Sequence, residues 1–307
     1  LLSFDTRELD YVSVPASLAA RVLAGSALKP DYAGRGIVLH RDIQPSISFF
    51  FFNLDHPLVG GYSPEKIGLR RAISMGYDRN AAVRQLRDGQ GIPANQPVPP
   101  PLFGHDPGYV APYGYDPAAA RALLDKLGYI DRDGDGYREL PDGKPLTLVL
   151  ASTTTAAARA SDELWKRNMD ALGLRITFLK NKWPELNRMS EAGQLMMWGL
   201  AWSSSIPEGI DFYSYFASGN IGTSNDARMR LPDYDALYEK ARNVPHGPPR
   251  TALFARLNDM IFSYAPWILT DYPYQNALVQ PWVGGFKQNP FKDQQWQYHD
   301  VGSRPRL

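Results

Sequence analysis

The chain has 307 residues, with 33 basic and 32 acidic side chains and a formal net charge of +1. This near-neutral balance argues against a nucleic-acid-binding protein, and the 44% of apolar residues argues against disorder. The longest strongly apolar run, residues 47–54, is much shorter than the roughly 20 residues of a membrane span. Because the chain contains no cysteine, disulfides, thiol nucleophiles and thiolate metal sites are excluded. The length predicts a globular protein of about two domains.

From the N-terminus, the first clear predicted elements are a buried strand and a long helix. Residues 1–46 contain one short helical pattern, and we interpret them as peripheral. Residues 47–54, ISFFFFNL, are short and aromatic and predict a buried strand. A serine at position 63, followed by proline and glutamate, is typical of a helix start, and we expect this helix to continue to Gly89.

Beyond residue 115, predicted helices and strands alternate. Asp116 and Pro117 begin a helix that Gly128 ends. The elements that follow are a strand at 146–151, a helix at 158–172, a strand at 174–180, a helix at 185–192, a strand at 195–202, helices at 233–243 and 249–264, and a strand-like segment at 266–279. Strands that alternate with crossover helices are typical of an α/β sheet.

One acidic loop has the opening pattern of a calcium-binding loop, D-x-D-x-D-G, in which alternating carboxylates and a glycine turn can surround a hard cation. Position 12 of such a loop is Asp142 here instead of glutamate, and a strand follows where a calcium loop precedes a helix. We therefore favour an Asp- and Gly-rich turn and keep a structural calcium site as the alternative. The candidate ligands are Asp131, Asp133, Asp135, Tyr137, Glu139 and Asp142.

Local signatures of catalysis are absent from the sequence, which contains no G-x-S-x-G, no phosphate-binding G-x-x-x-x-G-K-[ST] and no H-E-x-x-H. The five histidines are scattered, mostly beside proline or glycine. A pair of glycosidase carboxylates needs no local spacing. A calcium-stabilised carbohydrate-active enzyme with aromatic platforms is therefore the alternative to a binding protein, and a structural or signalling module is a weaker third.

Two tryptophans lie just where predicted strands end, the edge at which open α/β sheets bind ligands. Trp202 ends the strand at 195–202 and precedes a polar loop, and Trp183 follows the strand at 174–180. Large rigid aromatic surfaces at neighbouring strand ends could hold a ligand between them. Packing in the core or at the rim of the sheet is the alternative for both.

Several motifs occur in the same order as in a known family. They are GLRRAISMGYDRN (68–80), GIPANQPVPP (91–100), YDPAAARALLDKLGY (115–129), DGDGYRELPDGKPLTL (133–148), LPDYDALYEKA (231–241) and QPWVGGF (280–286). The chain thereby resembles the family 5 extracellular solute-binding proteins, the oligopeptide- and dipeptide-binding receptors of ABC importers. The match covers the later part of the family pattern, and Leu1 is not an initiator methionine. We expect a C-terminal portion that lacks most of the first lobe.

The resemblance implies a fold and a function. The fold is α/β, a lobe of the type II periplasmic-binding-protein kind with a mixed sheet and flanking helices, plus remnants of the other lobe. Residues 1–49 would belong to the first lobe up to the crossing strand, 50–265 would form the second, ligand-binding lobe, and 266–307 would return to the first. The implied function is to capture a peptide or other small solute by lobe closure, without catalysis or a required cofactor. The implied partner is an ABC permease in the inner membrane, for a periplasmic or extracellular, envelope-associated monomer.

Matched position by position, the resemblance also implies ligand-binding residues. Trp183 and Trp202 fall where peptide receptors of this family have pocket tryptophans 19 residues apart. Asn225 matches a pocket asparagine, and Tyr274 matches a tyrosine on the return segment.

One of the matched positions departs from the peptide receptors. Ser205 stands where they have an aspartate that pairs with the ligand's α-amino group. A neutral hydroxyl cannot offset the desolvation of an ammonium group, so we expect that free peptide N-termini are not recognised by the usual route. Glu208 or Asp211 could substitute for the aspartate, or the ligand is not a peptide.

Overall fold

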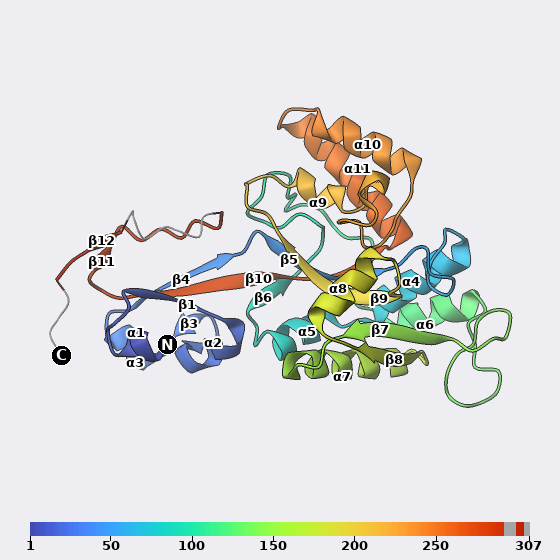
Figure 1. Ribbon diagram of the computed structural model, residues 1–307, viewed down its shortest axis with the longest axis horizontal. Helices are drawn as coiled ribbons and strands as arrows, with labels where there is room; N and C mark the ends of the chain where they lie inside the picture. Colours follow the sequence, from blue (N-terminus) through green and yellow to red (C-terminus); the bar gives the residue numbers. More distant parts are fainter. Residues whose placement is uncertain (292–298, 304–307) are drawn as a thin grey trace.

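The computed structural model describes residues 1–291 and 299–303, and it has the expected mixed α/β architecture (Figure 1). The main sheet has eight strands in the order β1-β10-β5-β9-β7-β8, with β4 and β6 also paired to β10. These strands are β1 (Tyr11–Val14), β4 (Val38–Ile43), β5 (Ser46–Phe52), β6 (Gly91–Pro93), β7 (Thr147–Ser152), β8 (Arg175–Lys180), β9 (Met197–Ser203) and β10 (Trp267–Val279). Two small sheets pair β2 (Leu23–Ala24) with β3 (Ala27–Leu28), and β11 (Val283–Gly284) with β12 (Asp300–Val301).

Helices flank the sheet along the chain. They are α1 (Leu2–Asp5), α2 (Ala16–Val22), α3 (Pro30–Gly34), α4 (Pro64–Gly76), α5 (Arg79–Leu86), α6 (Pro117–Lys126), α7 (Ala156–Asp170), α8 (Trp183–Glu191), α9 (Ile210–Ser214), the 3₁₀ helix η1 (Ser218–Asn220), α10 (Pro232–Arg242) and α11 (Pro248–Tyr264). None of the helices in the described residues is long and apolar enough to cross a membrane.

The long strand β10 runs through two apolar cores. Its N-terminal half pairs antiparallel with β5 and β6, and its C-terminal half pairs with β1 and β4. The larger core contains buried side chains from Ile47 to Tyr272, whereas the smaller core contains buried side chains between Phe4 and Ile37 together with Leu278. Figure 1 shows β10 crossing between the two parts of the molecule.

The prediction of one long helix at 63–89 is wrong in one respect, because the structure has two helices in this range. Helix α4 ends at Gly76, and α5 begins after Asp78, whose carboxylate accepts a hydrogen bond from the Ala81 N–H at 2.8 Å. Between them, the Tyr77 ring is buried against Phe50 and Trp165. An N-cap aspartate inside a helical pattern thus starts a second helix.

The unit β7-α7-β8-α8-β9 positions the candidate site. Strand β7 pairs in parallel with β8 on one side and with β9 on the other. Numbered in chain order, the three strands therefore lie in the spatial order 2-1-3, and the connections β7 to β8 and β8 to β9 run in opposite directions across the sheet. Open sheets of this kind bind ligands in the crevice where the strand order reverses, which here is the gap between β7 and β9.

Candidate functional site

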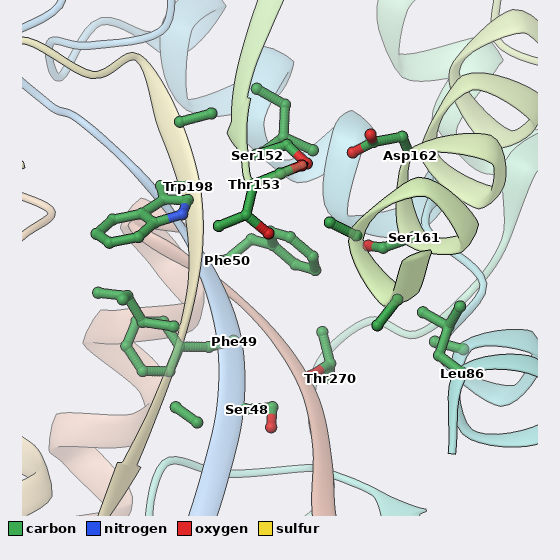
Figure 2. A pocket seen from close by; sticks show the side chains of 18 of the residues that line it. Ser48, Phe49, Phe50, Leu86, Ser152, Thr153, Ser161, Asp162, Trp198 and Thr270 are labelled. Carbon is green, nitrogen blue, oxygen red and sulfur yellow. The ribbon is translucent and has the colours of Figure 1, made fainter. Parts of the chain in front are cut away.

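A pocket of about 580 Å³ lies at the crevice between β7 and β9. Only Leu150 and Ala151 of β7 pair with β9, opposite Met197 and Trp198, and β9 continues to Ser203 past the point where β7 ends at Ser152. The side of α7, the end of α5 and parts of β5 and β10 close the remaining walls (Figure 2). The volume falls within the range of small-ligand pockets.

Aromatic side chains form much of the pocket wall. The Phe50 ring lies towards the middle of the pocket and packs edge-on against Trp165 at 4.9 Å between centroids (Figure 2). Gly199 accommodates this ring, because a Cβ atom at position 199 would lie 2.5 Å from Phe50. Trp198 lines the same pocket, with its ring centroid 6.2 Å from that of Trp183.

One ion pair in the wall joins α5's end to β10. Arg87 pairs with Asp271 and donates to the Ser48 hydroxyl at 2.6 Å. The Thr270 hydroxyl donates to the same aspartate at 3.0 Å. Burial raises the pKa of Asp271 above its usual value, although Arg87 acts in the opposite direction.

A second ion pair lies at the β7 side of the pocket. Asp162 of α7 pairs with Lys180 of β8. The Lys180 ammonium also donates to the Ser152 hydroxyl at 3.0 Å and to the Thr153 carbonyl at 3.1 Å. These bonds fix the carboxyl end of β7 beside the pocket.

The second half of β9 has an open edge towards the pocket. The Asn53 N–H donates to the Met196 carbonyl, and the Ser204 N–H donates to the Pro45 carbonyl. These two bonded pairs flank the β5–β9 ladder, so the register places its backbone hydrogen bonds at the even-numbered residues of β9. By alternation, the N–H and C=O groups of Gly199, Ala201 and Ser203 point away from β5. Within the described residues, no strand pairs with β9 on this side beyond Trp198.

Of the predicted ligand-binding residues, Trp183 lines the pocket and is 56% exposed. It is the first residue of α8, which begins two residues before the predicted helix. Trp202 is half-buried one residue beyond the pocket lining, and its ring stacks on Tyr215 at 5.0 Å. The Trp202 indole N–H is buried and has no hydrogen-bond partner in residues 1–291 and 299–303.

The other three predicted positions do not line this pocket. Ser205 is exposed in the loop after β9. Asn225 is 1% exposed, and its amide donates to the Ala217 and Met229 carbonyls, each at 3.0 Å, so it holds a loop. Tyr274 is partly covered by Arg41, whose guanidinium lies 3.9 Å from the ring centroid. For these three positions, ligand binding stays a prediction.

The two acidic residues suggested as substitutes near Ser205 differ in their surroundings. The Glu208 carboxylate pairs with Arg250 at 3.0 Å and accepts a hydrogen bond from the Ile210 N–H at 3.0 Å. Asp211 is exposed to solvent. Its pKa is raised, because the protein partly desolvates the carboxylate and because the Glu208 charge repels it. Glu208 is therefore engaged within the protein, which leaves Asp211 as the more accessible carboxylate of the two.

The acidic loop brings together four of the six predicted ligands. Carboxylate oxygens of Asp131, Asp133, Asp135 and Glu139 all lie within 4.8 Å of one another, a donor set that could hold a hard cation. Asp142 lies outside this cluster and its carboxylate pairs with Lys144 at 2.7 Å, so its role as a ligand stays a prediction. The Tyr137 ring packs against the Arg175 guanidinium.

Hydrogen bonds within the loop fit the turn interpretation. The Asp131 carboxylate accepts from the N–H groups of Gly134 at 2.7 Å and Gly136 at 2.9 Å. Both glycines have positive φ, which few other residues adopt without strain. Asp135 also pairs with Arg175, so one of the clustered charges is already balanced.

We expect Asp131→Ala to lower the free energy of unfolding by about 1–2 kcal/mol, because two backbone N–H groups lose their acceptor. Thermal unfolding followed by circular dichroism, with either calcium or a chelator present, measures the effect. The same loss is expected in both buffers, and Asp142→Ala, the control at an exposed position that accepts from one backbone N–H, should lower Tm much less. A loss confined to the calcium-containing buffer would contradict the turn and establish a cation site.

Sequence reasoning missed most of the pocket lining. Phe50 was predicted only as part of a buried strand, and Arg87, Asp162 and Asp271 had no assigned role. They come from four segments that only the folded sheet brings together. The usable signals are the predicted strand ends at 151 and 180, since ligands bind beyond such ends.

Comparison with known proteins identifies the family. Residues 1–224 match the family described as bacterial extracellular solute-binding proteins, family 5 Middle. The chain belongs to this family.

This family 5 chain is similar to curated relatives with different ligands in their names. It is 25% identical to Heme-binding protein A of Haemophilus influenzae over 74% of this chain and 40% of that protein. It is also 25% identical to Di/tripeptide-binding protein 2 of Pseudomonas aeruginosa, over 72% of this chain and 40% of that protein. The chain thus spans about 40% of the length of these relatives.

A solved structure shares the fold. The oligopeptide-binding protein AppA of Bacillus subtilis, in complex with a nonapeptide, superposes with a TM-score of 0.78 at 18% identity. The superposition covers 98% of this chain and 58% of that one. The predicted α/β class, with its mixed sheet and flanking helices, is therefore confirmed.

Proposed function

We propose that this chain is the ligand-binding part of a substrate-binding receptor of an ABC importer. The receptor captures a peptide or other small solute between two lobes and delivers it to a permease in the inner membrane. The family and the names of its relatives support this role. The relatives' roles as binding proteins also support capture without catalysis.

The open edge of β9 is the observation that carries the proposal. An extended peptide can add to a sheet edge by main-chain hydrogen bonds, while side-chain pockets provide specificity. Here the N–H and C=O groups of Ala201 and Ser203 that point away from β5 have no strand partner among the described residues, and Ala201 lines the pocket together with Trp183. An unpaired strand edge of this kind suits a ligand with an extended backbone.

Two lobes are supported by the two apolar cores. The proposed divisions are residues 1–49, 50–265 and 266–307, of which the last extends beyond the described residues. The larger core starts at Ile47 and reaches Tyr272, and the smaller core uses residues before 38 and Leu278. Strands β5 and β10 would be the crossing strands, and lobe closure about them would be stabilised by contacts that the ligand makes only in the closed state.

The location and partners follow from the same proposal. The receptor would be periplasmic or extracellular, associated with the cell envelope, and monomeric. It would bind no nucleic acid and require no cofactor. The family's extracellular description supports the location.

The carbohydrate-active enzyme gains no support from the pocket. A glycosidase needs one carboxyl group as an acid and another as a base or nucleophile. The two carboxylates of the pocket wall, Asp162 and Asp271, are each held in an ion pair. Failure of the purified protein to release sugar from any glycan substrate would agree with the receptor.

We expect Trp183→Ala to weaken ligand binding by at least about 1 kcal/mol, as for a tryptophan that anchors a ligand. Its indole is 56% exposed, so Tm should change little. The ligand is first identified by native mass spectrometry of a co-purified two-lobed receptor, and affinity is then measured by calorimetry. Tyr115→Ala, at an exposed aromatic outside the pocket lining, is the control. Equal affinities for Trp183→Ala and wild type would contradict the assignment.

A further inference from the structure

The charged groups in the pocket wall are already neutralised by the protein. Arg87 pairs with Asp271, and Asp162 pairs with Lys180. The aspartate side chains are only 7% and 10% exposed. A charged ligand group entering here would find no unpaired counterion among them.

The rest of the lining is uncharged. Among the residues that the structure describes, no other lysine, arginine, histidine or carboxylate lines the pocket. Ser48 and Ser152 each accept a hydrogen bond from one of the wall's cations. The surface that remains is largely apolar, and Phe50, Leu200 and the two lining tryptophans contribute to it.

The start of α7 does not create an anion site in this wall. Ala157 and Ala158 line the pocket from the first turn, and the Thr155 hydroxyl accepts the Ala158 N–H at 3.2 Å. The partial positive charge of a helix start attracts anions. Asp162, on the same helix and in the same wall, opposes that attraction with a full negative charge.

We propose that this pocket selects an uncharged, apolar group of the ligand, which in a peptide is an aliphatic or aromatic side chain. The ion pairs Arg87–Asp271 and Asp162–Lys180 determine this specificity, because within each pair the positive and the negative charge cancel. A carboxylate or ammonium group in the pocket would lose its hydration without gaining a free counterion. The inference rests on the proposed function, because it assumes that the ligand is held along the open edge of β9.

The test uses pentapeptides of alanine in which each position in turn carries Phe, Glu or Lys. For the wild-type two-lobed receptor, we expect one position at which Phe binds about tenfold or more tightly than Glu or Lys in calorimetry. Asp271→Asn should improve binding of the Glu peptide about tenfold, because Arg87 loses its partner. Arg87→Gln should instead favour the Lys peptide.

Two further variants make the test decisive. Asp162→Asn frees Lys180 and should also favour the Glu peptide, so the proposal can be tested if Asp271→Asn does not fold. Asp170→Asn is the matched control, since it frees Lys166 on the same helix in an exposed pair outside the pocket lining. It should leave the preference for Phe unchanged.

The outcomes separate the inference from the proposed function. Equal affinity of the wild type for the Phe, Glu and Lys peptides at every position would overturn the inference and leave the receptor role intact. An unchanged preference in all folded pocket variants would overturn it as well. Binding of none of the peptides would overturn the role as a peptide receptor and the inference with it.

Discussion

Replacing Arg70 with methionine is expected to lower the free energy of unfolding by about 4 kcal/mol, because several buried carbonyl groups lose their hydrogen-bond donors. Arg70 is 0% exposed on α4. Its guanidinium donates to the carbonyls of Tyr264 at 2.7 and 3.0 Å, Val59 at 2.8 Å and Gly61 at 2.9 Å. Burial lowers the pKa of Arg70 to about 10, which leaves it charged at neutral pH.

The Arg70 bonds join parts of the chain that lie far apart in sequence. Tyr264 is the last residue of α11, and the next residue, Ala265, has φ of 50°, so the chain turns sharply before β10 begins. The guanidinium thus caps α11 and fixes the turn that leads into the longest strand of the sheet. A methionine replaces the aliphatic part of the arginine side chain but supplies no donor.

Urea denaturation followed by circular dichroism measures the Arg70 effect. Arg71→Met is the matched control on the next residue, since Arg71 donates a single bond, to the Ser263 carbonyl at 2.5 Å, at a more exposed position. We expect this control to cost no more than about 1 kcal/mol. If both substitutions had equally small effects, Arg70 would not be the structural centre that its contacts indicate.

The sequence predicts local elements of this fold better than it predicts their partners. The helix at 249–264 was expected within one residue of α11, because proline starts it and its apolar residues recur at helical spacing. In contrast, residues 38–43 were interpreted as peripheral, and they form strand β4. Val38 and Arg41 in β4 pair with Val279 and Asn276 of β10, and no local pattern shows such a distant register.

The same limit applies to the candidate site. Trp183 could be predicted, because a tryptophan just past a strand end is conspicuous in the sequence and matches the family. The sequence does not show that the Asn225 amide bonds local carbonyls, as asparagines in loops commonly do, and its role in ligand binding stays a prediction. The Arg87–Asp271 pair joins residues 184 positions apart in the chain, and neither position has a sequence signal of its own.

The strongest test of ligand capture is a proline on the open edge of β9. Ala201 has its N–H on the side away from β5, so Ala201→Pro removes a donor that the β5–β9 ladder does not use. The ring also occupies the edge that an added strand would approach. We expect affinity for the ligand to fall about 100-fold, equivalent to about 2.7 kcal/mol, with a much smaller effect on folding.

Two companion substitutions show which edge of β9 matters. Ala201→Ser keeps the N–H and should bind the ligand as the wild type does. Leu200→Pro removes an N–H that bonds to β5 and should destabilise the sheet itself, which thermal unfolding would detect. If Ala201→Pro folded normally and kept its affinity, the ligand would not lie along β9. Because the family relatives bind ligands as different as heme and di/tripeptides by name, this outcome would favour a compact solute held by the pocket alone.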